Sequence, residues 1–371
     1  MSEQSPALTN ALDAIDKHAS DPLMAAKVRG LMIGYDARWK LSRYRMVGVE
    51  EVFHLPVVNP KTGKSSRTFT QSGKFDGVIE VDGRNYLLEH KTTSEDIADP
   101  DAPYWGILDI DSQVSSYALA NWQMGRKLDG TVYDVIRKPG IRPKDIPKAQ
   151  QKLIVSQREY CGFEVPVEIA LAVSQGQERE CFKLYEMRLA AETLENPNKY
   201  YQRRIIPRLD ADLAEYAAEM WDVGQSLLHA RQNNAHYRNS GACMNFNTPC
   251  TFLGVCRGHD TIDSEKWKRK EQHHSELPVE FDDRGLNVLT NSRIKCFQTC
   301  RRKHLYQYEM GVERIDAEER EALALGTLMH HGLEAWFQTF MKGGADAPSS
   351  EDAPAVNAVA GESAKQTELF V

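Results

Sequence analysis

The chain has 371 residues, 41% of them apolar, so it is long enough for one large domain or two ordinary ones around a substantial core. Its formal net charge of -7 excludes a surface that is basic throughout, although a local basic groove remains compatible with nucleic acid. No apolar run approaches the roughly 20 residues of a membrane-spanning helix, and the N-terminal sequence lacks the features of a secretion signal. We therefore expect a cytoplasmic protein with no membrane partner.

Hydrophobic periodicity divides the first part of the chain into alternating helical and extended segments. Residues 7–45 have a helical period, and residues 47–93 change to strands broken by "NPKTGKSS" and "DG". Helix returns near 111–124, a strand is predicted at 131–139, and residues 187–230 are helical again. This order suits an α/β or α+β core.

The second part of the chain begins with a polar stretch at 260–285, which we interpret mainly as linker. A mostly helical block follows, and the tail has the small, polar composition of disorder. The predicted domain organisation is a core at 1–275 with a cysteine cluster at 243–256, a linker at 276–286, a helical segment at 287–341 and a disordered tail at 342–371.

The stretch "FDGVIEVDGRNYLLEHKTT" combines a hairpin signal with unusual charges. A two-residue turn at Asp82-Gly83 would place Asp76 opposite Glu89, with Cβ atoms about 5 Å apart. Opposed carboxylates repel, so this pairing indicates a bound divalent cation such as Mg²⁺ or Mn²⁺. Lys91 lies on the same strand face, where its ammonium could orient a water or stabilise charge on a phosphate. The alternative is a set of ordinary polar residues on a solvated hairpin.

"FDGVI" and "LLEHKTT" resemble motifs II and III of the PD-(D/E)XK nuclease superfamily, and "DSQVSSYAL" resembles the Gln-x-x-x-Tyr helix of its RecB-type exonuclease branch. The resemblance implies a mixed central sheet flanked by helices, a restriction-endonuclease-like core. It also implies that Asp76, Glu89 and Lys91 are catalytic and that Gln113 and Tyr117 support Lys91 or the substrate strand.

That branch adds a helical histidine to the metal ligands, and the matching pattern here is "GTLMHHGLE" near the C-terminus. The resemblance implies that His330, Asp76, Glu89 and the backbone carbonyl of His90 hold Mg²⁺ or Mn²⁺. Glu50 and Glu51, on the preceding strand, could support these ligands, with little to decide between them.

The segment "SRIKCFQTCRRKHLYQYEMG" resembles the opening helix of the same family, although Arg301 stands where the family often has proline. The chain therefore resembles a phage-like RecB-type nuclease in circularly permuted order, with residues 286–340 preceding residues 7–275 in the linear family. Permutation is tolerated where the original termini lie close together. The alternative is a nuclease without its histidine, followed by a fragment of another copy.

Three of the seven cysteines, Cys243, Cys250 and Cys256, are clustered and resemble the C-terminal cysteines of iron–sulfur members of this branch. The resemblance implies that Cys300 supplies a fourth ligand, with Cys296 as a reserve. Four thiolates suit a [4Fe-4S] cluster or zinc, and the alternative is a set of buried or free thiols. The remaining cysteines, Cys161 and Cys181, follow no pattern, and we interpret them as structural.

The tail ends in "QTELF", which resembles the peptide that binds the bacterial sliding clamp through residues equivalent to Gln366, Leu369 and Phe370. Taken together, the resemblances predict a Mg²⁺- or Mn²⁺-dependent DNA nuclease, an exonuclease that hydrolyses phosphodiester bonds in DNA replication, recombination or repair. The alternative is a catalytically inactive DNA-binding or clamp-tethered adaptor.

Overall fold

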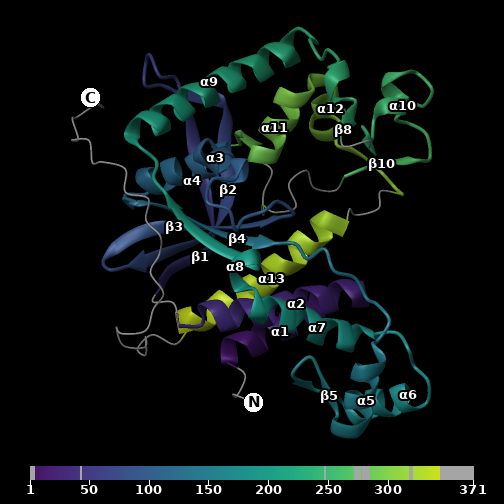
Figure 1. Ribbon diagram of the computed structural model, residues 1–371. Coiled ribbons are helices and arrows are strands. Elements are labelled where there is room, and N and C mark those ends of the chain that lie inside the picture. Colours follow the sequence, from purple (N-terminus) through teal and green to yellow (C-terminus); the bar gives the residue numbers. More distant parts are fainter. Residues whose placement is uncertain are drawn as a thin grey trace.

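The computed structural model describes residues 5–41, 44–245, 248–270, 277, 285–316 and 321–342. Figure 1 shows the arrangement of its elements. The strands are β1 (Arg45–Val58), β2 (Ser65–Val81), β3 (Arg84–Thr93), β4 (Gly130–Arg137), β5 (Glu159–Tyr160), β6 (Phe163–Glu164), β7 (Tyr201–Ile206), β8 (Met244–Asn245), β9 (Thr248–Pro249), β10 (Trp267–Arg269), β11 (Asn287–Leu289) and β12 (Val312–Arg314). The helices are α1 (Pro6–His18), α2 (Pro22–Trp39), α3 (Pro103–Asp109), α4 (Ser112–Gln123), α5 (Lys148–Gln157), α6 (Val167–Ser174), α7 (Phe182–Glu195), α8 (Pro197–Tyr200), α9 (Asp210–Gln232), α10 (Leu253–Cys256), α11 (Asn291–Thr299), α12 (Arg301–His304) and α13 (Glu321–Lys342), with short helical turns η1 (Ser240–Ala242) and η2 (Leu305–Glu309).

A mixed central sheet has the strand order β1-β2-β3-β4-β7. The pairs β1/β2, β2/β3 and β4/β7 are antiparallel, whereas β3 and β4 run parallel because α3 and α4 connect them by a crossover. The long strand β2 also pairs with β11 in parallel, beyond the end of β3. A strand from the C-terminal part of the chain therefore belongs to the same sheet as the hairpin.

Helices cover both faces of this sheet. In Figure 1, α1, α2, α7 and α13 lie on one side of the sheet, and α3, α4, α9 and α11 lie on the other. Adjacent residues of β3 point to opposite faces of the sheet. Leu88 packs in the core beneath α13, and Leu87 packs in the core beneath α4. The fold is therefore the predicted α/β architecture, a mixed central sheet flanked by helices, and it is consistent with a PD-(D/E)XK nuclease core.

The C-terminal helix α13 is part of the main core. Its apolar residues recur at helical spacing, and they pack against α1 and α2; they are Leu325, Leu328, Met329, Leu333, Trp336 and Phe337. Each such buried side chain contributes about 1.5–3 kcal/mol relative to exposure. The Trp336 indole also donates a hydrogen bond of 3.0 Å to the buried carboxylate of Asp36 on α2. The two ends of the described chain are thus packed as one unit.

Two sequence-based assignments are corrected by the structure. The stretch 187–230, predicted as helical, contains the strand β7, whose residues pair with β4. Tyr201 and Arg203 on β7 are buried on one face of the sheet and Ile206 on the other, so sheet pairing overrode the helical pattern on either side. Part of the predicted linker at 260–285 also forms structure, because β10 pairs with β12.

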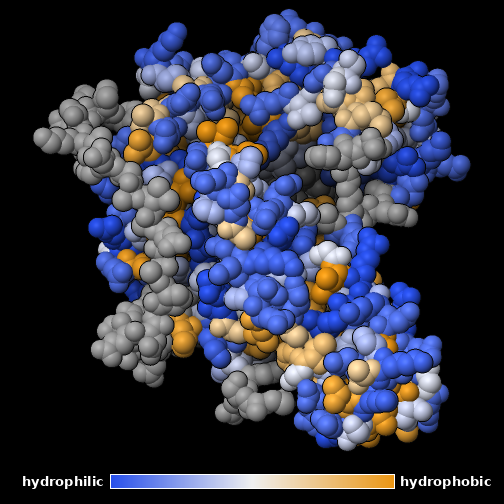
Figure 2. Space-filling view, viewed as in Figure 1, coloured by the Kyte–Doolittle hydropathy of each residue, from blue (hydrophilic) through white to orange (hydrophobic). Residues whose placement is uncertain are grey.

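A small lobe formed by α5, β5, β6, α6 and the start of α7 has its own core, against which Cys161 and Cys181 pack. That packing agrees with a structural interpretation of these two cysteines. Apolar side chains also remain exposed on the lobe, at Val155, Val167, Leu171 and Phe182, and Figure 2 shows orange atoms gathered there at the lower right. None of the helices in the described part of the chain is long and apolar enough to cross a membrane.

Candidate metal centre and its surroundings

The β2–β3 hairpin has the predicted register. Val81 pairs with Arg84 next to the turn, and the ladder continues to Gly77 opposite Leu88. Asp82 and Gly83 both have positive φ, of 50° and 76°, as a two-residue type I′ turn requires. The paired ladder ends one step short of Asp76 and Glu89, so their side chains are free to leave the regular strand geometry.

Beyond that step the two carboxylates take different partners. The Asp76 Oδ2 atom accepts a hydrogen bond of 2.7 Å from the backbone N–H of His90. Glu89 Oε1 accepts one of 2.8 Å from Lys91 Nζ, and Glu89 Oε2 is buried with no hydrogen-bond partner among the residues that the structure describes. A buried carboxylate oxygen without a partner is costly, and a cation would satisfy it.

The alternation of β1 and β2 is interrupted where the acidic residues lie. Phe75 and Val78, three residues apart on β2, pack in the same core, which regular alternation does not allow. Glu50 on β1, located opposite this point, has a φ of 54°, which is uncommon for a residue other than glycine. These irregularities accompany the turn of Glu50 and Asp76 toward α13.

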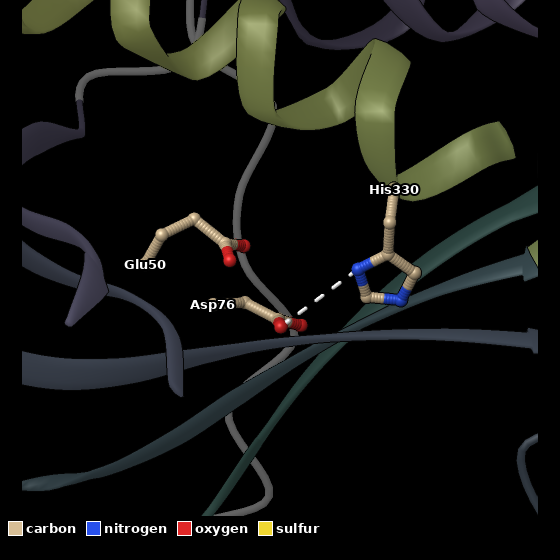
Figure 3. Close-up of side chains that lie close together, drawn as sticks. All are labelled: Glu50, Asp76 and His330. Atoms are coloured by element: carbon tan, nitrogen blue, oxygen red, sulfur yellow. Dashed lines mark ion pairs between the residues drawn. The ribbon is translucent and has the colours of Figure 1, made fainter. Parts of the chain in front are cut away.

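Glu50, Asp76 and His330 form a group whose ligand atoms all lie within 4.8 Å of one another. Figure 3 shows His330 descending from α13 toward the carboxylates of β1 and β2. The His330 Nδ1 atom is 3.8 Å from Asp76 Oδ1. The helix passes close over β3, since a Cβ added at Gly326 would lie 3.4 Å from the Thr92 hydroxyl oxygen. One imidazole and two carboxylates are an appropriate donor set for a divalent metal ion.

Burial shifts the pKa values of His330 and Glu50 in opposite directions, and both shifts favour the uncharged form. Burial lowers the pKa of His330, and the neighbouring His90 and Lys91 lower it further, so the imidazole is neutral at neutral pH. Burial raises the pKa of Glu50, and the carboxylates of Asp76 and Glu334 add to that effect against the opposing ion pair with Lys74. A cation between these residues would relieve the repulsion among the carboxylates.

Lys91 is held by three groups from two elements. Its Nζ donates hydrogen bonds to Glu89 Oε1 at 2.8 Å and to Gln113 Oε1 at 3.0 Å, and it lies 3.5 Å from Asp111 Oδ2. Gln113 is oriented in turn, because its Nε2 donates a bond of 2.7 Å to the Tyr117 hydroxyl. The structure therefore brings together Lys91, Gln113 and Tyr117 as one chain of hydrogen bonds, with the Tyr117 ring packed against Phe53 and Phe75.

The charges around Lys91 are unbalanced in the absence of metal. Burial and, next, the charge of Asp76 together raise the pKa of Glu89 to about 8, outweighing the effect of Lys91. Burial opposes the charge of Lys91, but Glu89 and Asp111 raise its pKa well above its usual range. The two pKa shifts are consistent with each other, because three carboxylates surround one ammonium. The lysine therefore stays charged, and Glu89 retains a proton.

We expect Glu89→Gln to stabilise the metal-free protein at pH 8 and to change it little at pH 5. Because the pKa of Glu89 is raised in the folded state, the folded chain binds more protons than the unfolded chain between about pH 4.5 and pH 8. The free energy of unfolding therefore falls as the pH rises through this window, by up to a few kcal/mol, and glutamine removes that loss. Denaturation in EDTA at both pH values checks this, with the exposed Glu95→Gln as control. The same pH slope in wild type and Glu89→Gln would contradict it.

The sequence did not distinguish the roles of three carboxylates near the centre. Glu50 and Glu51 could not be separated, but Glu50 turns toward Asp76 whereas Glu51 pairs with Arg126 at 2.5 Å. Asp111 was given no role, yet it caps α4 through the Gln113 N–H and lies beside Lys91. The signal was present, since aspartate before a helical run is a preferred N-cap.

His90 connects the hairpin to a buried polar network. Its Nδ1 atom is 3.2 Å from Asp134 Oδ2, and Arg203 donates to the same oxygen at 3.2 Å. Although burial opposes ionisation, Arg203 and His90 hold the pKa of Asp134 well below its usual range. The Tyr35 hydroxyl also donates to Asp134. The His90 ring thus belongs to this buried network, whereas the His90 backbone N–H donates the hydrogen bond to Asp76.

The four cysteines expected to act together line one cavity of about 20 Å³; they are Cys243, Cys250, Cys256 and Cys300. Burial raises the pKa of Cys256, and the other three thiols add to it. Arg238 and Lys303 also line the cavity and supply positive charge near the sulfurs. Cys296, the reserve candidate, is buried and is not among the lining residues of this cavity, with its sulfur 3.8 Å from Gln307 Oε1. It lies near the cluster, because burial raises its pKa and the Cys300 and Cys250 thiols add to that effect.

Comparison with known proteins bears on the C-terminal part of the chain. Residues 288–369 match the family model of the PD-(D/E)XK nuclease superfamily. The matched segment contains α11 and the His330 helix, whereas Asp76, Glu89 and Lys91 lie outside it. No curated protein and no solved structure matches the chain. Because members of that superfamily are metal-dependent phosphodiester hydrolases, the match indicates a metal-dependent nuclease.

Proposed function

We propose that the protein is a Mg²⁺- or Mn²⁺-dependent deoxyribonuclease of the RecB type, acting as an exonuclease. The observation that carries the proposal is the approach of His330 to Asp76, with Nδ1 3.8 Å from Oδ1 and Glu50 in the same group. The matched C-terminal segment supplies the histidine, and the hairpin supplies the carboxylates and the lysine. Neither part contains a complete site alone.

In this proposal His330 and Asp76 hold the metal together with Glu89 and the backbone carbonyl of His90, and Glu50 is a further ligand or a support for one. Of these residues, Glu50, Asp76 and His330 form the close group described above. The orphaned Glu89 Oε2 atom and the neutral imidazole fit that role. A bound divalent ion would generate a hydroxide nucleophile and polarise the phosphate.

Lys91 would act on the attacking water. Its ammonium is charged and is positioned by Glu89, Asp111 and Gln113, so little reorganisation is needed when a water or a phosphate oxygen replaces one of those partners. Gln113 and Tyr117 would act through Lys91 as positioning residues.

The activity is tested by incubating the protein with linear DNA in Mg²⁺ or Mn²⁺, with EDTA as the blank. We expect mononucleotides or short products from the ends of linear DNA, and none in EDTA. Equal cutting of closed circular DNA would contradict the exonuclease assignment. Binding of DNA without any cleavage would instead favour an inactive DNA-binding or clamp-tethered adaptor.

We further propose that the four clustered cysteines hold a [4Fe-4S] cluster, with zinc as the alternative. The shared cavity and the adjacent positive charges support this proposal. Protein purified without air should be brown and contain iron, and Cys300→Ser should lose both. Stoichiometric zinc without iron would replace the cluster by a zinc site.

The order of the segments is proposed to be a circular permutation of a phage-like RecB-type nuclease. The proposal is supported by β11, which joins the central sheet, and by α13, which covers it. A rearranged chain in which residues 286–341 precede residues 7–275 through a short linker should fold and cut DNA. An unfolded product would count against the permutation.

The clamp-binding residues Gln366, Leu369 and Phe370 lie outside the described residues. We keep the tail as a proposed sliding-clamp ligand in the cytoplasm, serving DNA replication, recombination or repair. The test is binding of the protein to an immobilised sliding clamp. Binding of Phe370→Ala equal to that of wild type would contradict this proposal.

A further inference from the structure

A second site is indicated by a cavity of about 480 Å³ away from the metal centre. It lies between α9, the loop at residues 237–239 and the C-terminal end of α11, in the upper part of Figure 1. Its volume is within the range of small-ligand sites, and its lining combines aromatic, cationic and amide side chains. Arg238, Asn239 and Cys300 also border the cysteine cavity, and the nuclease proposal uses none of the other lining residues.

An exposed aromatic ring and an arginine meet at this cavity. Tyr237 is 59% exposed, and the Arg301 guanidinium carbon lies 4.6 Å from the Tyr237 ring centroid and 5.0 Å from that of Phe297. The loop is braced, because Arg302 donates hydrogen bonds to the carbonyls of His236 and Tyr237. An aromatic ring presented on a fixed loop beside an arginine is a stacking platform for a base.

The charges of the cavity distinguish a nucleotide from a simple anion. Among the described residues, no carboxylate oxygen lies within 4.0 Å of the charged groups of Arg238 or Arg301, so both can receive a phosphate. Asp222 also lines the cavity and would repel a free phosphate, but its oxygens can accept from the amino group of a base. The Gln298 amide adds a donor and an acceptor.

Helix α11 extends from the neighbourhood of Lys91 to the cavity. Lys295 of α11 lies 4.0 Å from Asp111, which in turn is 3.5 Å from Lys91. Gln298 and Thr299, at positions i+3 and i+4 from Lys295, line the cavity about one helical turn, or roughly 5.4 Å, further on. A strand that reaches Lys91 can therefore follow this face of α11 into the cavity.

We propose that this cavity binds one nucleotide of a single-stranded DNA, with its base stacked on Tyr237 and its phosphate held by Arg238 and Arg301. The proposal rests on the proposed nuclease function, because it assigns the path of that substrate. It implies that the DNA approaches the metal centre as a single strand.

The test measures binding without cleavage, by fluorescence anisotropy of a labelled oligodeoxycytidine, whose bases carry an amino group, with the full chain in EDTA. We expect Tyr237→Ala to weaken binding about tenfold or more, and Tyr237→Phe to keep most of it, because stacking uses the ring. Arg301→Ala should weaken binding and reduce the dependence on salt by about one ion. The exposed Arg257→Ala, which removes the same charge from the neighbouring α10 segment, is the matched control.

The inference would be overturned if Tyr237→Ala bound the oligonucleotide as tightly as wild type. It would also be overturned if Arg257→Ala lost as much affinity as Arg301→Ala. An RNA oligonucleotide bound more tightly through the same residues would overturn the assignment to DNA. Because no cutting is measured, the two proposals fail separately. If the protein cuts DNA through Lys91 but Tyr237→Ala does not change binding, only the nucleotide-binding proposal is wrong. If the protein binds DNA through Tyr237 but never cuts it, only the nuclease proposal is wrong.

Discussion

Lys91→Met is expected to reduce cleavage of linear DNA by about 100- to 1000-fold, the usual cost of removing one positioned group that stabilises developing charge. Methionine retains most of the aliphatic stem and removes the ammonium, which is bonded to Glu89 and Gln113 and lies near Asp111. Since Lys91 is not a proposed metal ligand, binding of Mn²⁺ should persist. Initial rates at saturating metal, together with a metal titration, separate these effects.

A structural role alone would give a different result for Lys91→Met. The variant leaves Glu89, Asp111 and Asp76 without their common cation, so some loss of thermal stability is expected as well. Cleavage must therefore be compared below the unfolding temperature of the variant. Rates close to those of wild type would remove Lys91 from the mechanism and, with it, the main support for an active enzyme.

His330→Ala is expected to raise the metal concentration needed for half-maximal cleavage by at least about 10- to 100-fold, because it removes one of the proposed metal ligands. The adjacent histidine provides the control. His331 is not part of that group and stacks on His18 of α1, with ring centroids 4.1 Å apart. His331→Ala should therefore leave the metal requirement nearly unchanged.

The histidine pair also tests whether the two ends of the chain build one site. If the hairpin formed a complete nuclease without α13, both alanine variants would behave alike. Similar loss in both would indicate that α13 acts only through packing, since both residues lie on the same helix. A selective loss in His330→Ala would support the permuted arrangement.

Local signals in the sequence were sufficient to predict the turn and the strand register of the β2–β3 hairpin. The Asp82-Gly83 turn determines the register, because a two-residue turn leaves one pairing for the flanking strands. The Gln-x-x-x-Tyr spacing likewise places Gln113 and Tyr117 on one helix face, where they are hydrogen-bonded. The strand β7 was missed because its pairing with β4 is distant in sequence and overrides the surrounding helical pattern.

By itself, then, the sequence determined the α/β architecture, the hairpin register and the residue types of a metal site, because these depend on short-range periodicity and turn geometry. Only the tertiary structure decided the choice of Glu50 over Glu51, the position of Asp111 beside Lys91 and the 3.8 Å approach of His330 to Asp76. Those contacts depend on strand irregularities and on the packing of α13 against α1 and α2, which link residues far apart in the chain.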